Sequence, residues 1–248
     1  MAGDGVTVTW LGHGTFLYET PGGKRLLVDP LIEDNPKFPD GWHAPLAELD
    51  AIVLTHGHSD HLGGLIDIAS STGAPVLGIF DMAEWLVKQG LRETQFQGFN
   101  KGGTVEVAGV RLTMMPAQHS SSINVDGVPV YLGEPVGYVL RFEDGTCIYH
   151  SGDTCVFGDM RIIGDLYHPD AAVLPIGDHF TMGPDQAAYA AKLVGAPKVI
   201  PGHWGTFPLL SGTPEALREQ LAGSTIEVVS LEPGQSTTVS ARSGLGAL

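Results

Sequence analysis

Three histidines and an aspartate lie within six residues, in the segment His56-Gly-His58-Ser-Asp60-His61. The segment follows residues 51–55, an apolar run typical of a strand buried on both faces. In an extended chain, side chains two residues apart point the same way, so His56 and His58 can meet at one metal ion. A turn after His58 would aim Asp60 and His61 at a neighbouring position. The spacing therefore predicts two adjacent metal half-sites in one loop, and the alternative is a polar turn that happens to hold histidines.

A pair of metal ions needs more ligands than this loop provides. Three further candidates each come just after a predicted strand: His119, Asp153 and His203. Loops on a rigid sheet commonly carry functional groups. Each of these residues alone would as readily be structural, but together with the histidine loop they favour ligands. Imidazole and carboxylate without thiolate suit zinc, manganese or iron(II). We therefore expect one or two divalent ions, with zinc or manganese favoured.

Several other residues near these motifs have two interpretations. His13 lies in a turn between two predicted strands, where a histidine is usually exposed or bonded locally. His179 precedes a predicted helix, whose start favours an anion such as a substrate carboxylate or phosphate. Cys155, two residues after Asp153, is expected to be a buried free thiol and not a ligand. The polar segment 118–134 either flanks a substrate cleft or forms a surface loop.

Short apolar runs bounded by glycine and proline predict a strand-rich chain with helices towards its two ends. Predicted strands cover residues 5–11, 15–19, 25–29, 51–55, 104–108, 110–116, 136–142, 145–150, 171–175, 197–200 and 225–229. Predicted helices run from Asp81 to Gly90, from Pro184 to Gly195 and from Thr213 to Gly223. This pattern predicts one domain over residues 1–248, with two sheets packed face to face and helices outside.

Composition limits the classes of partner. Twenty-eight acidic residues against 13 lysines and arginines give a formal net charge of −15. Nucleic acid is bound by neutralising its phosphates, so this acidic chain without a basic cluster is not expected to bind it. No apolar run approaches the ~20 residues that cross a bilayer, and no signal peptide is visible. With two cysteines, Cys147 and Cys155, we expect free thiols, a cytoplasmic location and no membrane partner.

The order of these motifs resembles the five motifs of the metallo-β-lactamase superfamily, over nearly the whole chain. The matching stretches are Asp29 in LLVDP, THGHSDH from Thr55, His119, Asp153 and His203. More narrowly, WLGHGTF, IGDHFTMGP and PGHWGTFP are similar to a largely uncharacterised bacterial group of metal-dependent hydrolases. That group is related to the ascorbate-6-phosphate lactonases.

The resemblance implies an α/β fold in which two mixed β-sheets flanked by helices form a four-layer αββα sandwich with metals at one edge. It implies two divalent ions, held by His56, His58 and His119 and by Asp60, His61 and His203, with Asp153 bridging. Asp29 would orient the histidine loop from behind, as carboxylates do for ligating imidazoles. The alternative for Asp29 is a turn cap before Pro30. The resemblance also favours a place near the metals for His13, as a substrate-binding or supporting group.

Such a centre predicts hydrolysis by a metal-activated water. Two ions ~3.5–4 Å apart can share a water whose pKa falls toward ~7. The substrate would be a small ester, lactone, amide or phosphoester, with Asp60 or Asp153 moving the proton and His179 a further catalytic candidate. The alternative is an iron-dependent oxidoreductase on the same fold, which a filled second metal position disfavours. A homo-oligomer is compatible with the resemblance, but composition does not predict one.

Overall fold

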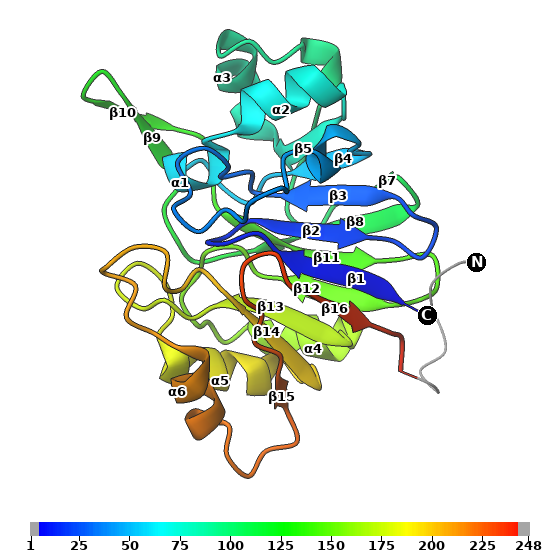
Figure 1. The fold of residues 1–248 in the computed structure, drawn as a ribbon, viewed down its shortest axis with the longest axis vertical. Coiled ribbons are helices and arrows are strands. Elements are labelled where there is room, and N and C mark those ends of the chain that lie inside the picture. The colour runs from blue at the N-terminus through cyan, green and yellow to red at the C-terminus, as the bar shows by residue number, and fades with distance from the viewer. Residues whose placement is uncertain (1–4, 243–248) are drawn as a thin grey trace.

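The computed structural model describes residues 5–242, in which two seven-stranded β-sheets face each other (Figure 1). The first has the order β16-β1-β2-β3-β4-β5-β6, with strands Val6–Trp10 (β1), Phe16–Glu19 (β2), Arg25–Val28 (β3), Ala51–Val53 (β4), Val76–Ile79 (β5), Phe96–Phe99 (β6) and Ser236–Val239 (β16). The second has the order β15-β14-β13-β12-β11-β8-β7, with strands Thr104–Val107 (β7), Val110–Pro116 (β8), Val136–Arg141 (β11), Cys147–His150 (β12), Ala171–Pro175 (β13), Lys198–Gly202 (β14) and Glu227–Val228 (β15). Both sheets mix parallel and antiparallel pairs, as expected.

Helices complete the outer layers. The longer ones are Leu65–Thr72 (α2) and Ala83–Lys88 (α3) beside the first sheet, and Met160–Tyr167 (α4), Pro184–Val194 (α5) and Pro214–Gln220 (α6) beside the second (Figure 1). One turn of helix, Ser59–Leu62 (α1), lies at the sheet edge, and three 3-10 helices cover Pro45–Ala47 (η1), Phe80–Met82 (η2) and Glu93–Gln95 (η3). The result is the four-layer αββα sandwich that the resemblance implies.

The core between the sheets is apolar, and the Tyr138 hydroxyl buried in it is paired. Trp10 and Phe16 of the first sheet and Leu112 of the second belong to one buried cluster. The buried Tyr138 hydroxyl crosses between the sheets and donates to the carbonyl of Leu54 at 2.7 Å. A paired hydroxyl avoids the desolvation penalty that an unpaired one would carry. This contact fixes the second sheet against the residue just before the histidine loop.

Strand direction explains why the predicted ligands converge. β1, β3 and β4 run the same way in the first sheet, because β2 lies antiparallel between β1 and β3. In the second sheet β8, β12, β13 and β14 share a direction, because β11 lies antiparallel between β8 and β12. Residues that follow these strands therefore meet at one edge of the sandwich, called here the metal edge.

Most predicted helix ends are confirmed. Pro184 begins α5, and Gly195 ends it in the left-handed conformation with φ 67°. Thr213 caps α6, accepting the Ala216 N–H at 3.2 Å. The cap predicted at Asp81 is wrong, because α3 begins after Met82 without any side-chain cap bond. The helix predicted to end at Gly223 ends earlier, because the last residue of α6 is Gln220.

The segment 118–134 forms an unpredicted β-hairpin, with strands Ser122–Val125 (β9) and Val128–Tyr131 (β10). Its turn residues, Asp126 and Gly127, have φ of 51° and 83°, as a two-residue type I′ turn requires. The hairpin projects from the sandwich beside α1 (Figure 1). Within residues 5–242, no helix is long and apolar enough to cross a bilayer. That the whole chain, 1–248, is one domain stays a prediction.

Candidate metal centre

The first group of potential ligands contains His56, His58 and His119. Ligand atoms of these three side chains all lie within 4.8 Å of one another. His56 Nε2 lies 2.9 Å from His58 Nδ1. His56 is fully buried, whereas the other two are half-buried, so this group faces outward through His58 and His119. The extended backbone of His58, with φ −76° and ψ 149°, is consistent with the predicted convergence of His56 and His58.

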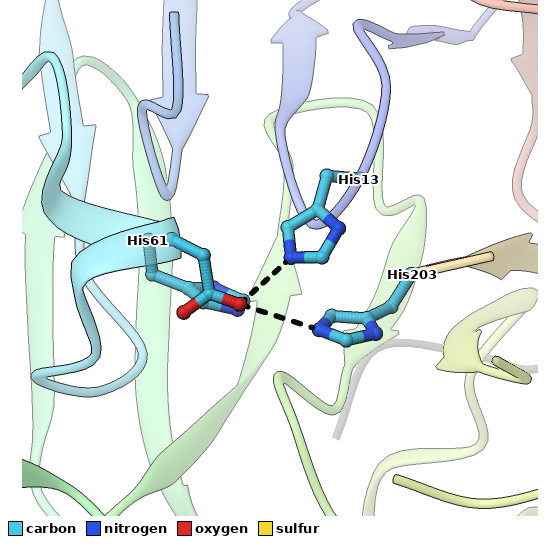
Figure 2. Close-up of side chains that lie close together, drawn as sticks. His13, His61 and His203 are labelled. Atoms are coloured by element: carbon cyan, nitrogen blue, oxygen red, sulfur yellow. Dashed lines mark hydrogen bonds and ion pairs between the residues drawn. The ribbon is translucent and has the colours of Figure 1, made fainter. Parts of the chain in front are cut away.

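The second group contains Asp60, His61 and His203, together with His13. One ligand atom from each lies within 4.8 Å of the others. Figure 2 shows His13, His61 and His203 approaching one point from the β1–β2 turn, from α1 and from the end of β14. His13 is fully buried, and its Nε2 donates to Asp60 Oδ2 at 2.9 Å. His13 is therefore neither exposed nor bonded only within its own turn.

Asp153 lies between the two groups. Its Oδ2 is 3.0 Å from His203 Nε2 and 3.3 Å from His61 Nε2. The same oxygen is 3.7 Å from His119 Nε2 and 3.9 Å from His56 Nε2. Four imidazoles from three separate segments thus surround one carboxylate oxygen, which is the place that a bridging ligand would occupy.

Asp29 lies behind this cluster. Its Oδ2 accepts the Nδ1–H of His61 at 2.8 Å and the Thr55 hydroxyl at 2.5 Å, while its Oδ1 accepts the Thr55 backbone N–H at 2.8 Å. Holding the Nδ1 side of His61 leaves Nε2 directed into the cluster, which is how carboxylates orient ligating imidazoles. The side-chain contacts of Asp29 therefore run to Thr55 and His61, and they favour orientation of the histidine loop over a turn cap before Pro30.

Buried nitrogen atoms in the cluster lack hydrogen-bond partners. Within the described chain these include His61 Nε2 and both ring nitrogens of His203, because the nearby Asp153 Oδ2 does not lie in hydrogen-bond geometry to either Nε2 atom. An unsatisfied buried polar atom is costly, and most such atoms in proteins have a partner. A cation between His61, His203 and Asp153 would satisfy the two Nε2 atoms, and the nitrogen and oxygen donors are those that zinc and manganese accept. The residues present therefore fit a divalent metal pair.

The first group is electrostatically suited to metal binding. Burial lowers the pKa of His56, His58 and His119. A lowered pKa keeps imidazole neutral, which is the form that binds metals.

The second group holds protons that a metal would replace. Burial alone would lower the pKa of His203, but the Asp153 carboxylate outweighs it and raises that pKa to about 9. The pKa of His61 is raised in the same way by Asp153 and Asp29. Burial would raise the pKa of Asp153, but the neighbouring imidazoles hold it well below its usual range. Metal binding here would therefore release protons.

Two residues considered in the sequence lie apart from the cluster. His179 is exposed, and its ring contact within the described residues is with Phe180, at 4.4 Å between centroids. A catalytic role for His179 stays a prediction. Cys155 is exposed, so the expectation of a buried thiol is wrong, and it belongs to no candidate metal group in residues 5–242.

The sequence did not predict several supporting contacts, most of which join segments that are distant in the chain. Gly14 touches the His61 ring, since a Cβ at position 14 would lie 2.6 Å from His61 Cε1. The carbonyl of His13 accepts both the Trp10 indole N–H at 2.8 Å and the His203 backbone N–H at 2.9 Å. The glycines on both sides of His13 were the available sequence signal, since close approach commonly requires glycine.

The beginning of the hairpin segment also touches the histidine loop. Ser120 Oγ lies 3.1 Å from His58 Nε2, and the Gly57 N–H donates to Ser121 Oγ at 3.0 Å. A Cβ at Gly57 would lie 2.6 Å from the Leu132 Cβ, at the other end of the hairpin. Both ends of the hairpin are thus fixed to the loop that carries His56 and His58.

A family model, two relatives by sequence and one solved structure match most of this chain and agree with one another. Residues 24–204 match the family model described as Beta-lactamase superfamily domain. A UPF0173 metal-dependent hydrolase of Chloroflexus aurantiacus is 54% identical over 239 residues, covering 95% of this chain and 98% of the relative. Another from Herpetosiphon aurantiacus is 51% identical, covering 94% and 97%. Igni18, a novel metallo hydrolase from Ignicoccus hospitalis, has a TM-score of 0.83 and 34% identity, covering 96% of this chain and 99% of that structure.

Proposed function

Because the chain belongs to the β-lactamase superfamily domain family, whose relatives here are metal-dependent hydrolases, we propose that its His/Asp cluster binds two zinc or manganese ions. The proposed substrate is a small molecule with an ester, lactone, amide or phosphoester bond. His56, His58 and His119 would hold one ion, and Asp60, His61 and His203 the other. The observation that carries the proposal is the position of Asp153, whose Oδ2 lies within 3.9 Å of an imidazole nitrogen of each of four histidines from three segments.

The centre would activate water for attack on the substrate. Bound divalent ions lower the pKa of a shared water and so supply a hydroxide at neutral pH. The two aspartates differ in access: the Asp60 side chain is 36% exposed, whereas that of Asp153 is 5% exposed. Asp60 can therefore pass a proton between the site and solvent, while buried Asp153 is suited to holding the two halves together. We assign the proton transfer to Asp60.

His13 would keep Asp60 in place for this role. Its Nε2–H donates to Asp60 Oδ2, and its buried ring packs against His203 with centroids 4.0 Å apart. Burial lowers the pKa of His13 to about 4, so the ring is neutral and donates without adding a charge. A neutral donor leaves the negative charge of Asp60 available for a cation.

Metal analysis combined with a hydrolysis panel tests the proposal. Protein purified in chelator should be inactive towards p-nitrophenyl esters, lactones and bis(p-nitrophenyl) phosphate, and zinc or manganese should restore activity on at least one of them. Asp153→Asn should lose metal and activity together. Stoichiometric iron, a visible absorption band and oxygen consumption without hydrolysis would support the oxidoreductase alternative and overturn this proposal.

A further inference from the structure

The metal edge carries few cations that could hold an anionic substrate. The segments that follow strands at this edge are 11–15, 29–44, 54–64, 80–82, 100–103, 117–135, 151–159, 176–183, 203–213 and 229–235. Apart from histidines, the cationic residues in them are Lys37 and Lys101, and there is no arginine. Lys101 is already paired with Glu134. Phosphate and carboxylate groups are usually held by arginine or lysine.

Acidic side chains dominate the same edge. Asp34 and Asp40 flank Lys37 in the sequence, and both are exposed. The start of α5, where an anion could have been held, is covered by the protein's own carboxylates. A Cβ at Gly183 would lie 3.1 Å from Asp185 Oδ1 and 3.5 Å from Asp178 Cγ. With a net charge of −15, the chain as a whole also repels anions.

The hairpin adds an apolar wall beside the first metal group. Strand register places Val125 opposite Val128 and Ile123 opposite Val130, so these four side chains share one face. Ile123 and Val130 pack on the core, whereas the outer pair remains in solvent, with Val128 61% exposed. Because the base of the hairpin is fixed to Gly57, this apolar stripe starts at the histidine loop.

Other exposed apolar residues lie at the same edge. Tyr131 is 63% exposed, and Phe180 and Leu209 are each 55% exposed, in the loops after β13 and β14. Apolar side chains that remain in water next to a catalytic centre are suited to covering an apolar ligand.

We infer that the substrate is an uncharged molecule and not a phosphorylated metabolite. Its apolar arm lies along the β9–β10 hairpin. This inference rests on the proposed function. For an ester or lactone, the water oxygen would bond to the acyl carbon, the acyl C–O bond would break, and the departing oxygen would take a proton.

Chain-length dependence tests the apolar arm. The metal-loaded full chain is assayed with p-nitrophenyl esters from acetate to octanoate, alongside p-nitrophenyl phosphate and bis(p-nitrophenyl) phosphate. We expect kcat/KM to rise about two- to fourfold per added methylene and to be lowest for the two phosphates. A flat dependence on chain length, or a tenfold preference for a phosphate, would overturn the inference while leaving a working hydrolase. No hydrolysis of any probe by protein that holds its metals would overturn the proposed function as well.

Matched variants locate the arm. Val125→Ser and Val128→Ser, which replace the two exposed residues of the stripe, should each lower kcat/KM for octanoate about three- to tenfold, mainly through KM, and leave acetate hydrolysis and metal content unchanged. Leu166→Ser on α4 is the control, because Leu166 is 59% exposed and lies outside the metal-edge segments. Equal effects of the hairpin and control substitutions, or no effect of either, would refute a role for the hairpin.

Discussion

His13 Nε2 donates to Asp60 Oδ2 at 2.9 Å, linking the turn after β1 to the helix that follows β4. The two residues are 47 positions apart in sequence, and the bond is shielded by the buried His13 ring. Asp60 has no comparably short contact with the other described residues of its group, since His61 Nε2 and His203 Nε2 lie 4.0 and 3.9 Å from the same oxygen. The orientation of Asp60 therefore depends on His13.

Replacing His13 should weaken the second metal position selectively. We expect His13→Ala to lower the affinity for the second equivalent of zinc about 10–100-fold, because contacts that orient a ligand contribute that much. His13→Gln should retain most of the affinity, since its amide can still donate to Asp60. Competition with a chromophoric chelator measures both equivalents. If His13→Gln binds the second zinc as weakly as His13→Ala does, His13 is itself a ligand. The control is His43→Gln, because His43 is exposed.

Gly14→Ala should disturb His61. The added Cβ would lie 2.6 Å from His61 Cε1, and the ring cannot easily retreat because Asp29 holds its Nδ1 at 2.8 Å. We expect a loss of about 1–3 kcal/mol in the free energy of unfolding, measured in urea, and weaker binding of the second zinc. Gly158→Ala is the matched control, because a Cβ there meets nothing within 4 Å. Equal stability of the two variants would contradict the close contact.

His150 should make the metal-free protein less stable in mild acid. Burial lowers its pKa to about 4, and its Nδ1 shares a hydrogen bond of 2.8 Å with the Tyr18 hydroxyl. In the unfolded chain this histidine has a pKa of about 6.5 and binds a proton, whereas in the folded chain it stays neutral until about pH 4. The free energy of unfolding therefore falls as pH drops below ~6.5. His150 should account for a loss of about 2 kcal/mol in the free energy of unfolding between pH ~6.5 and ~5. Urea unfolding of His150→Gln in chelator should lack that part of the pH dependence; an unchanged dependence would refute the assignment.

Thiol labelling should distinguish the two cysteines. Cys155 is exposed, whereas Cys147 is buried and burial raises its pKa to about 11. A thiol reagent such as Ellman's reagent should therefore modify one thiol in the folded protein and two after unfolding, because the thiolate is the reactive form. Cys155→Ser should abolish the reaction of the folded protein, and labelling should leave the metal content unchanged. Loss of metal on labelling would instead place Cys155 near the centre.

The metal edge could be predicted largely from sequence because its residues follow recognisable strands. His56, His119 and His203 each come shortly after an apolar run, and the shared direction of those strands brings them together. The hairpin was missed although Asp126-Gly127 between valines is a strong turn signal, because the surrounding segment is polar. The contact between Gly14 and His61 could not be predicted, since it depends on how two loops pack in three dimensions.

Anomalous X-ray diffraction from crystals grown with zinc tests the central claim most directly. The account predicts two anomalous peaks ~3.5–4 Å apart, one beside His56, His58 and His119 and the other beside Asp60, His61 and His203, with Asp153 touching both. Soaking with chelator should remove both peaks. The absence of any peak at this cluster, or a zinc ion bound only elsewhere on the chain, would contradict the account.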